Sequence, residues 1–436
     1  MAIIPQISLF QWEQDIEILG DLERLQLVLE NLPDEGLVRL LEKERGQGRN
    51  DYPVRAMWNS LLAGLVYQHP STASLIRELQ RNVQLRYLCG FTSLDKVPNA
   101  YNFSRFLALL LGHQDELDRI FQELVKEIAL VLPGFGTRLA MDSKYVSSLA
   151  RRKSQREEAD GRSEQDADLG MKSYHGVHKD GTPWEKVVKC FGFKLHLVVD
   201  AEYELPVAFQ VTKASASDCV EGHQLLDKLL KEQEEIVKTC AYLSGDKGYD
   251  DTKLIEKLRS EPFGIKPVID TRQMWKGEKE RPVPGYKDVY YNEQGEVHCY
   301  DPKLGTKHLM SCDGYEAKRD CLRKQCPVKA YGICCPGYGS CPNQGGVRIP
   351  LAVDKRIFNA VDRSSYKFRR EYRHRTAVER VNSRLDNSLG FERHTIRGMK
   401  KMTFRLSLAL ILMLTMALGR IRQKQPALMR SLVQTA

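Results

Sequence analysis

The chain has 436 residues, of which 42% are hydrophobic and 28% are charged, and its formal net charge is +9. These values are ordinary for a soluble globular protein with room for two or three domains and a sizeable core. Eleven cysteines, seven of them between Cys299 and Cys341, do not fit the disulfide framework of a secreted protein, so we expect a protein of the reducing cytoplasm.

Neither a targeting signal nor a membrane span is expected. The first residues, MAIIPQISLFQWEQD, lack a basic segment followed by an apolar one. The longest apolar run, Leu406–Leu418, has 13 residues and as a helix would reach about 20 Å, short of the ~30 Å hydrocarbon core of a bilayer. We therefore predict a fully buried helix over this run and no membrane partner.

The first 135 residues are predicted to be helical. Apolar residues recur there at helical spacing in five segments, which are separated by turns that contain Gly or Pro. The segments are Leu22–Leu29, Leu37–Leu41, Val54–Tyr67, Thr72–Gln80 and Asn102–Leu111. Four arginines of this part could face a DNA backbone or could be ordinary surface residues; they are Arg77, Arg81, Arg86 and Arg105.

After residue 136 the pattern becomes that of strands. Strands are predicted over Arg138–Val146, Lys189–Asp200 and Leu205–Thr212. The strongly polar stretch Ala150–Lys186 is predicted to be a long, partly disordered loop.

A helix, a strand, a helix and a strand then follow, over Leu225–Ile236, Lys238–Leu243, Thr252–Arg259 and Gly264–Ile269. Asp218 and Glu221 are predicted to form a capping box before the first of these helices. Residues 270–360 are rich in Gly, Pro, Tyr and Cys and are predicted to be an irregular insertion, after which two helices complete the core. This order suits an α/β fold with a mixed sheet flanked by helices, not a doubly wound dinucleotide-binding fold.

A helix predicted over Tyr366–Leu389 carries two patterns. Tyr372, Arg375 and Glu379 stand at i, i+3 and i+7 and share one face. Glu379 is either the partner of a salt bridge or a metal ligand beside a polyanion that the arginines hold. A second, apolar face is predicted to point to the core and is formed by Val378, Val381, Leu385 and Leu389.

Positive charge is concentrated around this helix. The segment Lys355–Arg405 holds fifteen Lys or Arg residues against five Asp or Glu residues. Such a concentration suits a phosphate backbone better than a small acidic ligand, and a merely solvated basic face is the alternative.

Three acids from distant parts of the chain could form one site. Asp142 lies within the first strand, Asp246 lies between glycines where the fourth strand ends, and Glu379 lies on the late helix. Acids at the ends of strands are exposed at the rim of a sheet, where ligands usually bind. Three carboxylates offer the hard oxygen ligands that Mg²⁺ prefers, and two such ions support an in-line displacement at phosphorus.

Several motifs together resemble those of the DDE transposases of bacterial insertion sequences, which have an RNase H-like catalytic core. They are MDSKYV at Met141–Val146, FGFKLHLVVD at Phe191–Asp200, LSGDKGYDD at Leu243–Asp251, and YRHRTAVERVNSRL at Tyr372–Leu385, and the N-terminal part is also similar, at Asn50–Tyr67 and Asn102–Phe106. The last of the four core motifs follows the family's Tyr-x2-Arg-x3-Glu signature. The resemblance covers most of the chain.

The resemblance implies four parts. Residues 1–135 would be a helical domain that binds DNA ends, 136–269 the first part of the RNase H-like core, 270–360 a Cys-rich insertion, and 361–436 the C-terminal helices that complete the core.

The resemblance also implies an activity. The chain would bind terminal inverted repeats as a homodimer on DNA, then cleave strands and transfer them to target DNA. Asp142, Asp246 and Glu379 would ligate two Mg²⁺ or Mn²⁺ ions, and Tyr372 and Arg375 would contact phosphates near the cleavage site.

One departure from the family is Asp386, which stands where the signature has a lysine. An acid there would repel DNA, so the grip on phosphate would need Arg384, Arg397 or Lys400 instead. The alternatives are therefore an inactive or repurposed transposase that only binds DNA, or a structure-selective nuclease on the same core.

The cysteines of the insertion form a further candidate site. Thiolates in tight turns can close a tetrahedral zinc site, although no pair here has the two-residue gap typical of zinc fingers. The predicted ligands of a structural Zn²⁺ are Cys321, Cys326, Cys334 and Cys341. Reduced cysteines in an irregular loop region are the alternative.

Overall fold

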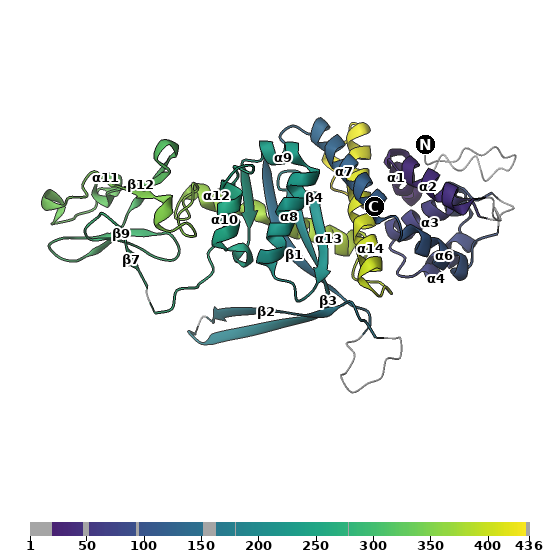
Figure 1. Ribbon diagram of the computed structural model, residues 1–436, viewed down its shortest axis with the longest axis horizontal. Coiled ribbons are helices and arrows are strands. Elements are labelled where there is room, and N and C mark those ends of the chain that lie inside the picture. Colours follow the sequence, from purple (N-terminus) through teal and green to yellow (C-terminus); the bar gives the residue numbers. More distant parts are fainter. Residues whose placement is uncertain are drawn as a thin grey trace.

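A computed structural model of the chain describes residues 20–46, 52–92, 96–150, 163–178, 180–277 and 279–432. The N-terminal stretch tested for a targeting signal, Asn50 and Asp51 of the first N-terminal motif, and residues 151–162 of the expected loop lie outside the described residues. The molecule is elongated, with the insertion at one end, a central sheet, and the N-terminal helices at the other end (Figure 1).

The N-terminal part is helical, as predicted. Its helices are α1 (Glu23–Asn31), α2 (Glu35–Arg45), α3 (Val54–Val66), α4 (Thr72–Arg81), α5 (Val83–Cys89), α6 (Ala100–Leu110) and α7 (Gln114–Val131). Polar side chains cap the N-termini of α4, α5 and α6. The Ser71 hydroxyl and the Asn82 and Asn99 amide oxygens accept hydrogen bonds from backbone N–H groups of the first turns.

The central sheet is mixed, which confirms the predicted α/β, RNase H-like class. Its strands are β1 (Arg138–Ser147), β2 (Asp168–Val177), β3 (Pro183–Asp200), β4 (Leu205–Lys213), β5 (Tyr242–Gly245) and β6 (Lys266–Ile269). The strand order is β2-β3-β1-β5-β6, and β4 also pairs with β3. The pairs β1–β3 and β3–β4 are antiparallel, whereas β1–β5 and β5–β6 are parallel.

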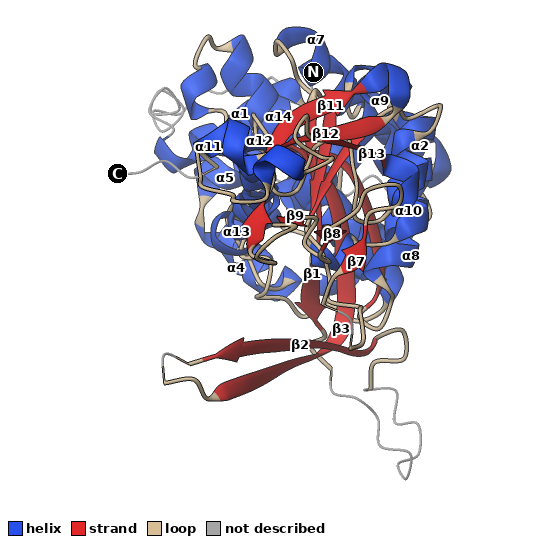
Figure 2. Cartoon of the chain, turned by 90° about the vertical axis from the view of Figure 1, so that its left-hand side faces the viewer, coloured by secondary structure: helices blue, strands red, loops and turns tan. Residues whose placement is uncertain are grey.

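A long two-stranded ribbon replaces most of the loop expected over Ala150–Lys186. Strand β2 pairs with the first half of β3, and the ribbon projects away from the body of the molecule (Figure 2). Residues 183–187 of the ribbon are exposed, whereas residues 192–200 of the same strand are buried. The ribbon has polar side chains because solvent covers its outer half, and this composition hides the alternation by which strands are predicted.

Helices pack on the sheet from later parts of the chain. They are α8 (Asp218–Glu232), α9 (Glu234–Thr239), α10 (Thr252–Arg259), α12 (Tyr366–Tyr372), α13 (Thr376–Ser388) and α14 (Met399–Arg422). The predicted helix Tyr366–Leu389 is interrupted, since Arg373–Arg375 form a 3-10 turn between α12 and α13. Other 3-10 turns are Gly20–Leu22, Lys247–Tyr249, Ala317–Arg319, Tyr338–Ser340, Leu351–Val353 and Pro426–Leu428.

Helix α14 contains the apolar run Leu406–Leu418 and is the core helix that was predicted. Among the described residues it is the one helix long and apolar enough to cross a membrane, but 89% of its most apolar window is buried. It packs against α7, α1 and β4, and thereby joins the N-terminal helices to the central sheet.

The insertion contains two small sheets and a short helix. One sheet has the order β10-β9-β8-β7 and the other β11-β12-β13. The elements are β7 (Arg281–Pro282), β8 (Val289–Tyr291), β9 (Val297–Tyr300), β10 (Lys307–Leu309), β11 (Ser311–Glu316), β12 (Cys321–Gln325), α11 (Pro327–Tyr331) and β13 (Val347–Pro350). The insertion has an apolar cluster of its own, in which Val297, Leu322 and Ile349 are buried.

Buried ion pairs connect the insertion to the core. Asp250, which is fully buried, accepts hydrogen bonds from Arg356 at 2.6 Å and from Arg363 at 3.2 Å. Arg356 also pairs with Glu293 of the insertion. Because Asp250 lies four residues after Asp246, this network fixes the loop that carries the predicted second acid.

Candidate active site

Asp142 and Asp246 lie side by side because their strands are parallel neighbours. Met141 of β1 is opposite Gly245 of β5, so the two aspartates are the next residues on adjacent strands. A backbone N–H holds each carboxylate, from Ser143 to Asp142 Oδ1 and from Gly248 to Asp246 Oδ1, both at 2.7 Å. The pair thus lies at one edge of the sheet, by which we mean the end at which the inner strand β5 stops, as the sequence predicts.

The aspartates repel each other in a half-buried environment. Burial and, to a lesser extent, the negative charge of Asp246 raise the pKa of Asp142 to about 6, against the opposing effects of the Ser143 N–H group, Lys172 and Arg375. A divalent cation between the two carboxylates would relieve this repulsion.

Arg375 brings Glu379 into the same site. Its Nη1 atom lies 3.6 Å from Asp142 Oδ2 and 2.8 Å from Glu379 Oε1. One guanidinium nitrogen therefore stands between the first and third predicted acids. Glu379 therefore forms a salt bridge, which was one of the two interpretations from the sequence. Its position also suits the other interpretation, a metal ligand, because 54% of its side chain is exposed beside Asp142.

Tyr372 lines the same edge. Its ring stacks on Phe368, with centroids 5.7 Å apart, and the Arg375 guanidinium lies 5.8 Å from the ring centroid. Burial raises the pKa of the Tyr372 hydroxyl, and the charges of Asp270 and Asp246 act in the same direction. The structure therefore places all five predicted site residues at one edge of the sheet.

These residues fit divalent cations. The three acids supply carboxylate oxygens, the ligands that Mg²⁺ and Mn²⁺ take, and Asp142 and Asp246 already share one edge. Arg375 now offsets part of their negative charge.

Asp386 does not present an unpaired negative charge. Lys144 Nζ of β1 donates to Asp386 Oδ2 at 2.6 Å and lies 3.4 Å from Glu392 Oε1. Lys144 is two residues after Asp142 on the same strand, so a cation stands close to the place where the family signature has one. Asp386 is therefore paired with a cation in the free protein, and its effect on DNA binding stays a prediction.

Of the three proposed substitutes for the missing lysine, Arg384 is excluded. Its guanidinium donates to the carbonyl oxygen of Glu204, and burial lowers its pKa to about 10. Arg397 and Lys400 are exposed and stay candidates.

Asp218 is a fourth carboxylate beside the site, and it does not form the capping box that the sequence predicts. Asp218 accepts a hydrogen bond from the buried Lys194 at 3.1 Å, and Glu221 accepts one from Gln210 at 2.9 Å, so neither forms the predicted capping box. A Cβ atom on Gly248 would lie 2.7 Å from Asp246 Oδ1 and 3.5 Å from Asp218 Oδ2. Gly248 is needed because the two acids approach its backbone from either side.

Lys194 is the residue from which the role of Asp218 could have been predicted. It lies within the buried strand FGFKLHLVVD, and a buried lysine requires a carboxylate partner. His196, on the same strand face, is fully buried and lies 3.9 Å from Asp218 Oδ1.

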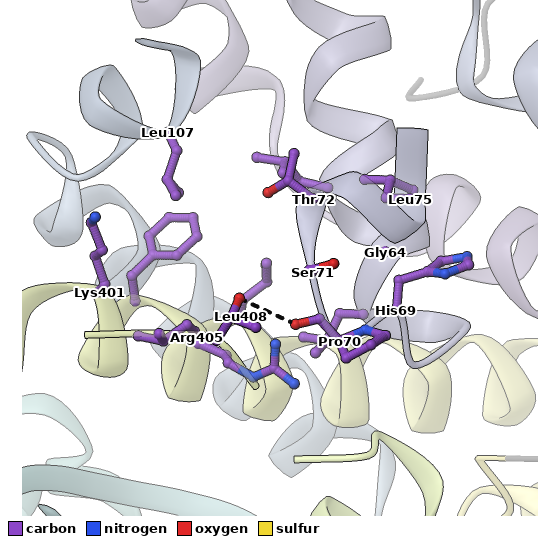
Figure 3. Close-up of a pocket in the computed structure, with 15 residues that line it drawn as sticks. Gly64, His69, Pro70, Ser71, Thr72, Leu75, Leu107, Lys401, Arg405 and Leu408 are labelled. Atoms are coloured by element: carbon purple, nitrogen blue, oxygen red, sulfur yellow. Dashed lines mark hydrogen bonds between the residues drawn. The ribbon is translucent and has the colours of Figure 1, made fainter. Parts of the chain in front are cut away.

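A separate pocket of about 140 Å³ lies between the N-terminal helices and α14 (Figure 3). Its lining includes Leu61, Pro70 and Arg405 and none of the five site residues. The Thr395 hydroxyl closes one side by donating to the Pro70 carbonyl oxygen at 3.5 Å. This pocket plays no part in the site at the sheet edge.

Comparisons with known proteins place this geometry in context. The family profile described as "Transposase DDE domain" matches residues 171–415, which include Asp246 and Glu379 but not Asp142. A second profile, described as "Transposase domain (DUF772)", matches residues 15–109 of the helical part.

Among curated proteins, none matches the chain significantly. Among solved structures, the piggyBac transposase synaptic complex with hairpin DNA is similar over 96% of this chain and 80% of that chain, with 12% identity and a TM-score of 0.38.

Proposed function

Since the chain belongs to the transposase DDE-domain family and is a DNA transposase, we propose that Asp142, Asp246 and Glu379 are its catalytic carboxylates. They would hold two Mg²⁺ or Mn²⁺ ions. The observation that carries this proposal is the single Arg375 nitrogen that contacts both Asp142 and Glu379, beside the neighbouring strand end of Asp246.

The reaction consists of two displacements at phosphorus. Water first attacks the phosphodiester at the end of the element, so one P–O bond forms, another breaks, and a free 3′-hydroxyl leaves. That hydroxyl then attacks a phosphodiester of the target DNA and releases a target 3′-hydroxyl. When bound, the metal ions activate the attacking oxygen and stabilise the leaving oxygen. No covalent protein intermediate forms, so no nucleophilic side chain is needed.

Tyr372 and Arg375 are the proposed contacts to phosphate near the cleavage site. The Tyr372 hydroxyl is a donor at the sheet edge, and the planar fork of Arg375 matches the two free oxygens of a phosphodiester. In the free protein the fork is held by Asp142 and Glu379. Carboxylates that held metal ions would release Arg375, which could then bind the DNA backbone.

The parts of the chain divide the remaining tasks. Residues 1–135 would bind the terminal inverted repeats, 136–269 and 361–436 would build the catalytic core, and 270–360 would be an insertion between them. Two DNA ends must be joined in one event, so the active form would be a homodimer on DNA, acting in the cytoplasm.

A cleavage assay tests this proposal. A labelled duplex that carries the repeat flanking the gene is incubated with Mg²⁺ or Mn²⁺ and either the wild type or Asp246→Asn. The control is Asp227→Asn, which changes an exposed side chain of α8. We expect metal-dependent cutting at the tip of the repeat by wild type and control, and binding without cutting by Asp246→Asn.

Two other results would redirect the interpretation. Cutting of branched or hairpin DNA without preference for the repeat would indicate a structure-selective nuclease. Binding without cutting by every variant, the wild type included, would indicate an inactive or repurposed transposase.

A further inference from the structure

A group of possible metal ligands lies in the insertion, away from the catalytic edge (Figure 1). Ligand atoms of Asp301, His308 and Cys335 all lie within 4.8 Å of one another. Asp301 follows β9 directly, His308 is the middle residue of β10, and Cys335 lies in the loop after α11. The fold thus brings a carboxylate and an imidazole of one hairpin to a thiol of a later loop.

His308 has unused hydrogen-bonding capacity at this point. Its Nε2 atom is buried and has no hydrogen-bond partner among the described residues. A buried polar atom without a partner costs about 1–3 kcal/mol. In the tautomer that carries its proton on Nδ1, the Nε2 atom presents a lone pair, and histidine is the commonest metal ligand. A bound cation would therefore supply the partner that the protein does not.

Cys335 and Asp301 already stand at the distance of two ligands of one ion. The Cys335 thiol donates to Asp301 Oδ2, with 3.3 Å between sulfur and oxygen. Ligand atoms of a tetrahedral Zn²⁺ lie about 3.3–3.8 Å apart, because each is about 2.0–2.3 Å from the ion. His308 begins within 4.8 Å, so it would need to move by about 1.5 Å at most.

Backbone groups hold the buried Asp301 in place. Its Oδ1 atom accepts hydrogen bonds from the N–H groups of Lys303 and Leu304, and its Oδ2 atom accepts one from Gly337. The other lone pair of Oδ2 accepts the proton of the Cys335 thiol and becomes available when that proton leaves. Carboxylates that bind metals are supported by hydrogen bonds of this kind.

Gly337 allows the later loop to approach Asp301 closely. A Cβ atom on Gly337 would lie 2.5 Å from Asp301 Oδ1 and 2.6 Å from Pro302 Cδ. A larger residue would push the loop away from the hairpin, and Cys335 would move with it. The contact between the two segments therefore depends on glycine at this position.

We propose that Asp301, His308 and Cys335 bind one Zn²⁺ ion. A thiolate, an imidazole and a carboxylate are all ligands of zinc, whereas sulfur and nitrogen atoms do not suit the Mg²⁺ or Mn²⁺ of the catalytic edge. The ion takes the place of the thiol proton of Cys335, which passes to solvent. Water completes the tetrahedron, and the ion joins the β9–β10 hairpin to the loop after α11.

This set differs from the one predicted from the sequence. Cys321 Sγ lies 4.0 Å from Glu316 Oε2, and Cys334 is exposed. Cys299 is the cross-strand partner of His308 but does not belong to the group. Within the described part of the insertion, the group also contains none of the four predicted thiols, Cys321, Cys326, Cys334 and Cys341. The proposed site therefore has one thiolate instead of four.

The zinc content of the purified full-length protein tests the ligand set. The wild type should carry about one Zn²⁺ per chain, and His308→Asn and Cys335→Ser should lose it. Cys299→Ser and Cys334→Ser are the matched controls, because each removes a neighbouring thiol, and both should keep the zinc. Loss of zinc from either control, or its retention by both His308→Asn and Cys335→Ser, would overturn the proposal.

X-ray absorption at the zinc edge requires no variant and therefore does not depend on how variants fold. For the wild type we expect one sulfur neighbour at about 2.3 Å and nitrogen or oxygen neighbours at about 2.0–2.2 Å. Three or four sulfur neighbours would indicate a site made of thiols, and no sulfur neighbour would indicate zinc bound to carboxylates such as those of the catalytic edge. Either spectrum, or wild-type protein without zinc, would contradict the proposal.

Discussion

Removal of Arg375 should make the stability of the protein depend strongly on divalent metal. In Arg375→Gln, Asp142 and Glu379 lose the one guanidinium nitrogen that they share, and Asp246 still repels Asp142. The Asp142 side chain is only 15% exposed, so its unpaired charge costs about 1–2 kcal/mol. Glu379 is 54% exposed, and solvent screening reduces its share to about 0.5 kcal/mol or less.

A divalent cation reverses this loss, because it supplies the positive charge that the guanidinium provided. In the wild type, Arg375 competes with the cation, and a unit charge a few ångströms away costs metal binding on the order of 1–2 kcal/mol. Arg375→Gln should therefore bind Mg²⁺ roughly tenfold more tightly than the wild type. It should nevertheless cut DNA poorly, because the proposed contact to phosphate is lost.

Thermal unfolding in EDTA and in millimolar Mg²⁺ measures both effects. We expect Arg375→Gln to unfold at a lower temperature than the wild type in EDTA and to recover most of the difference in Mg²⁺. Arg380→Gln, which removes the same charge from α13 but breaks a pair with Glu204, is the control and should show no such recovery. An equal deficit of Arg375→Gln in both buffers would refute the reasoning, since no cation would then lie between the carboxylates.

Three further predictions follow from other parts of the structure. Asp386→Asn should remove the nearer of the two carboxylates that pair with Lys144 and strengthen DNA binding a few-fold, with about one more ion released in the salt dependence of affinity. Burial lowers the pKa of His196 from 6.5 to about 4, so only the unfolded chain takes up this proton as the pH falls from 6.5 to 4. Folding stability should therefore drop in that window by up to about 3 kcal/mol, and urea unfolding of His196→Gln should show a smaller drop. Asp250→Asn removes the buried carboxylate that Arg356 and Arg363 share and should lower the free energy of unfolding by about 3–5 kcal/mol.

The strands and helices that build the site could be predicted because the sequence is locally consistent there. Asp142 and Asp246 interrupt or end short apolar strands, and the Tyr372, Arg375 and Glu379 spacing marks one face of a helix. The 3-10 turn that separates α12 from α13 could not be predicted. Arg373–Arg375 include no Gly or Pro, the residues that mark a break in a helix.

Other features depend on tertiary contacts and could not be predicted. The partner of Asp386 is Lys144, more than two hundred residues earlier in the chain. The ribbon of β2 and β3 is polar because nothing covers it. Cys335 lies beside Asp301 and His308 only because the β9–β10 hairpin and a later loop fold together.

The most direct test of the catalytic proposal is the position of Mn²⁺ in crystals of the protein bound to DNA that carries its terminal repeat. Anomalous scattering from manganese locates the ions independently of any assumption about ligands. The account predicts two peaks among the carboxylates of Asp142, Asp246 and Glu379, with Arg375 turned toward a phosphate. Manganese elsewhere on the protein, with the salt bridges of Arg375 intact in the DNA complex, would contradict it.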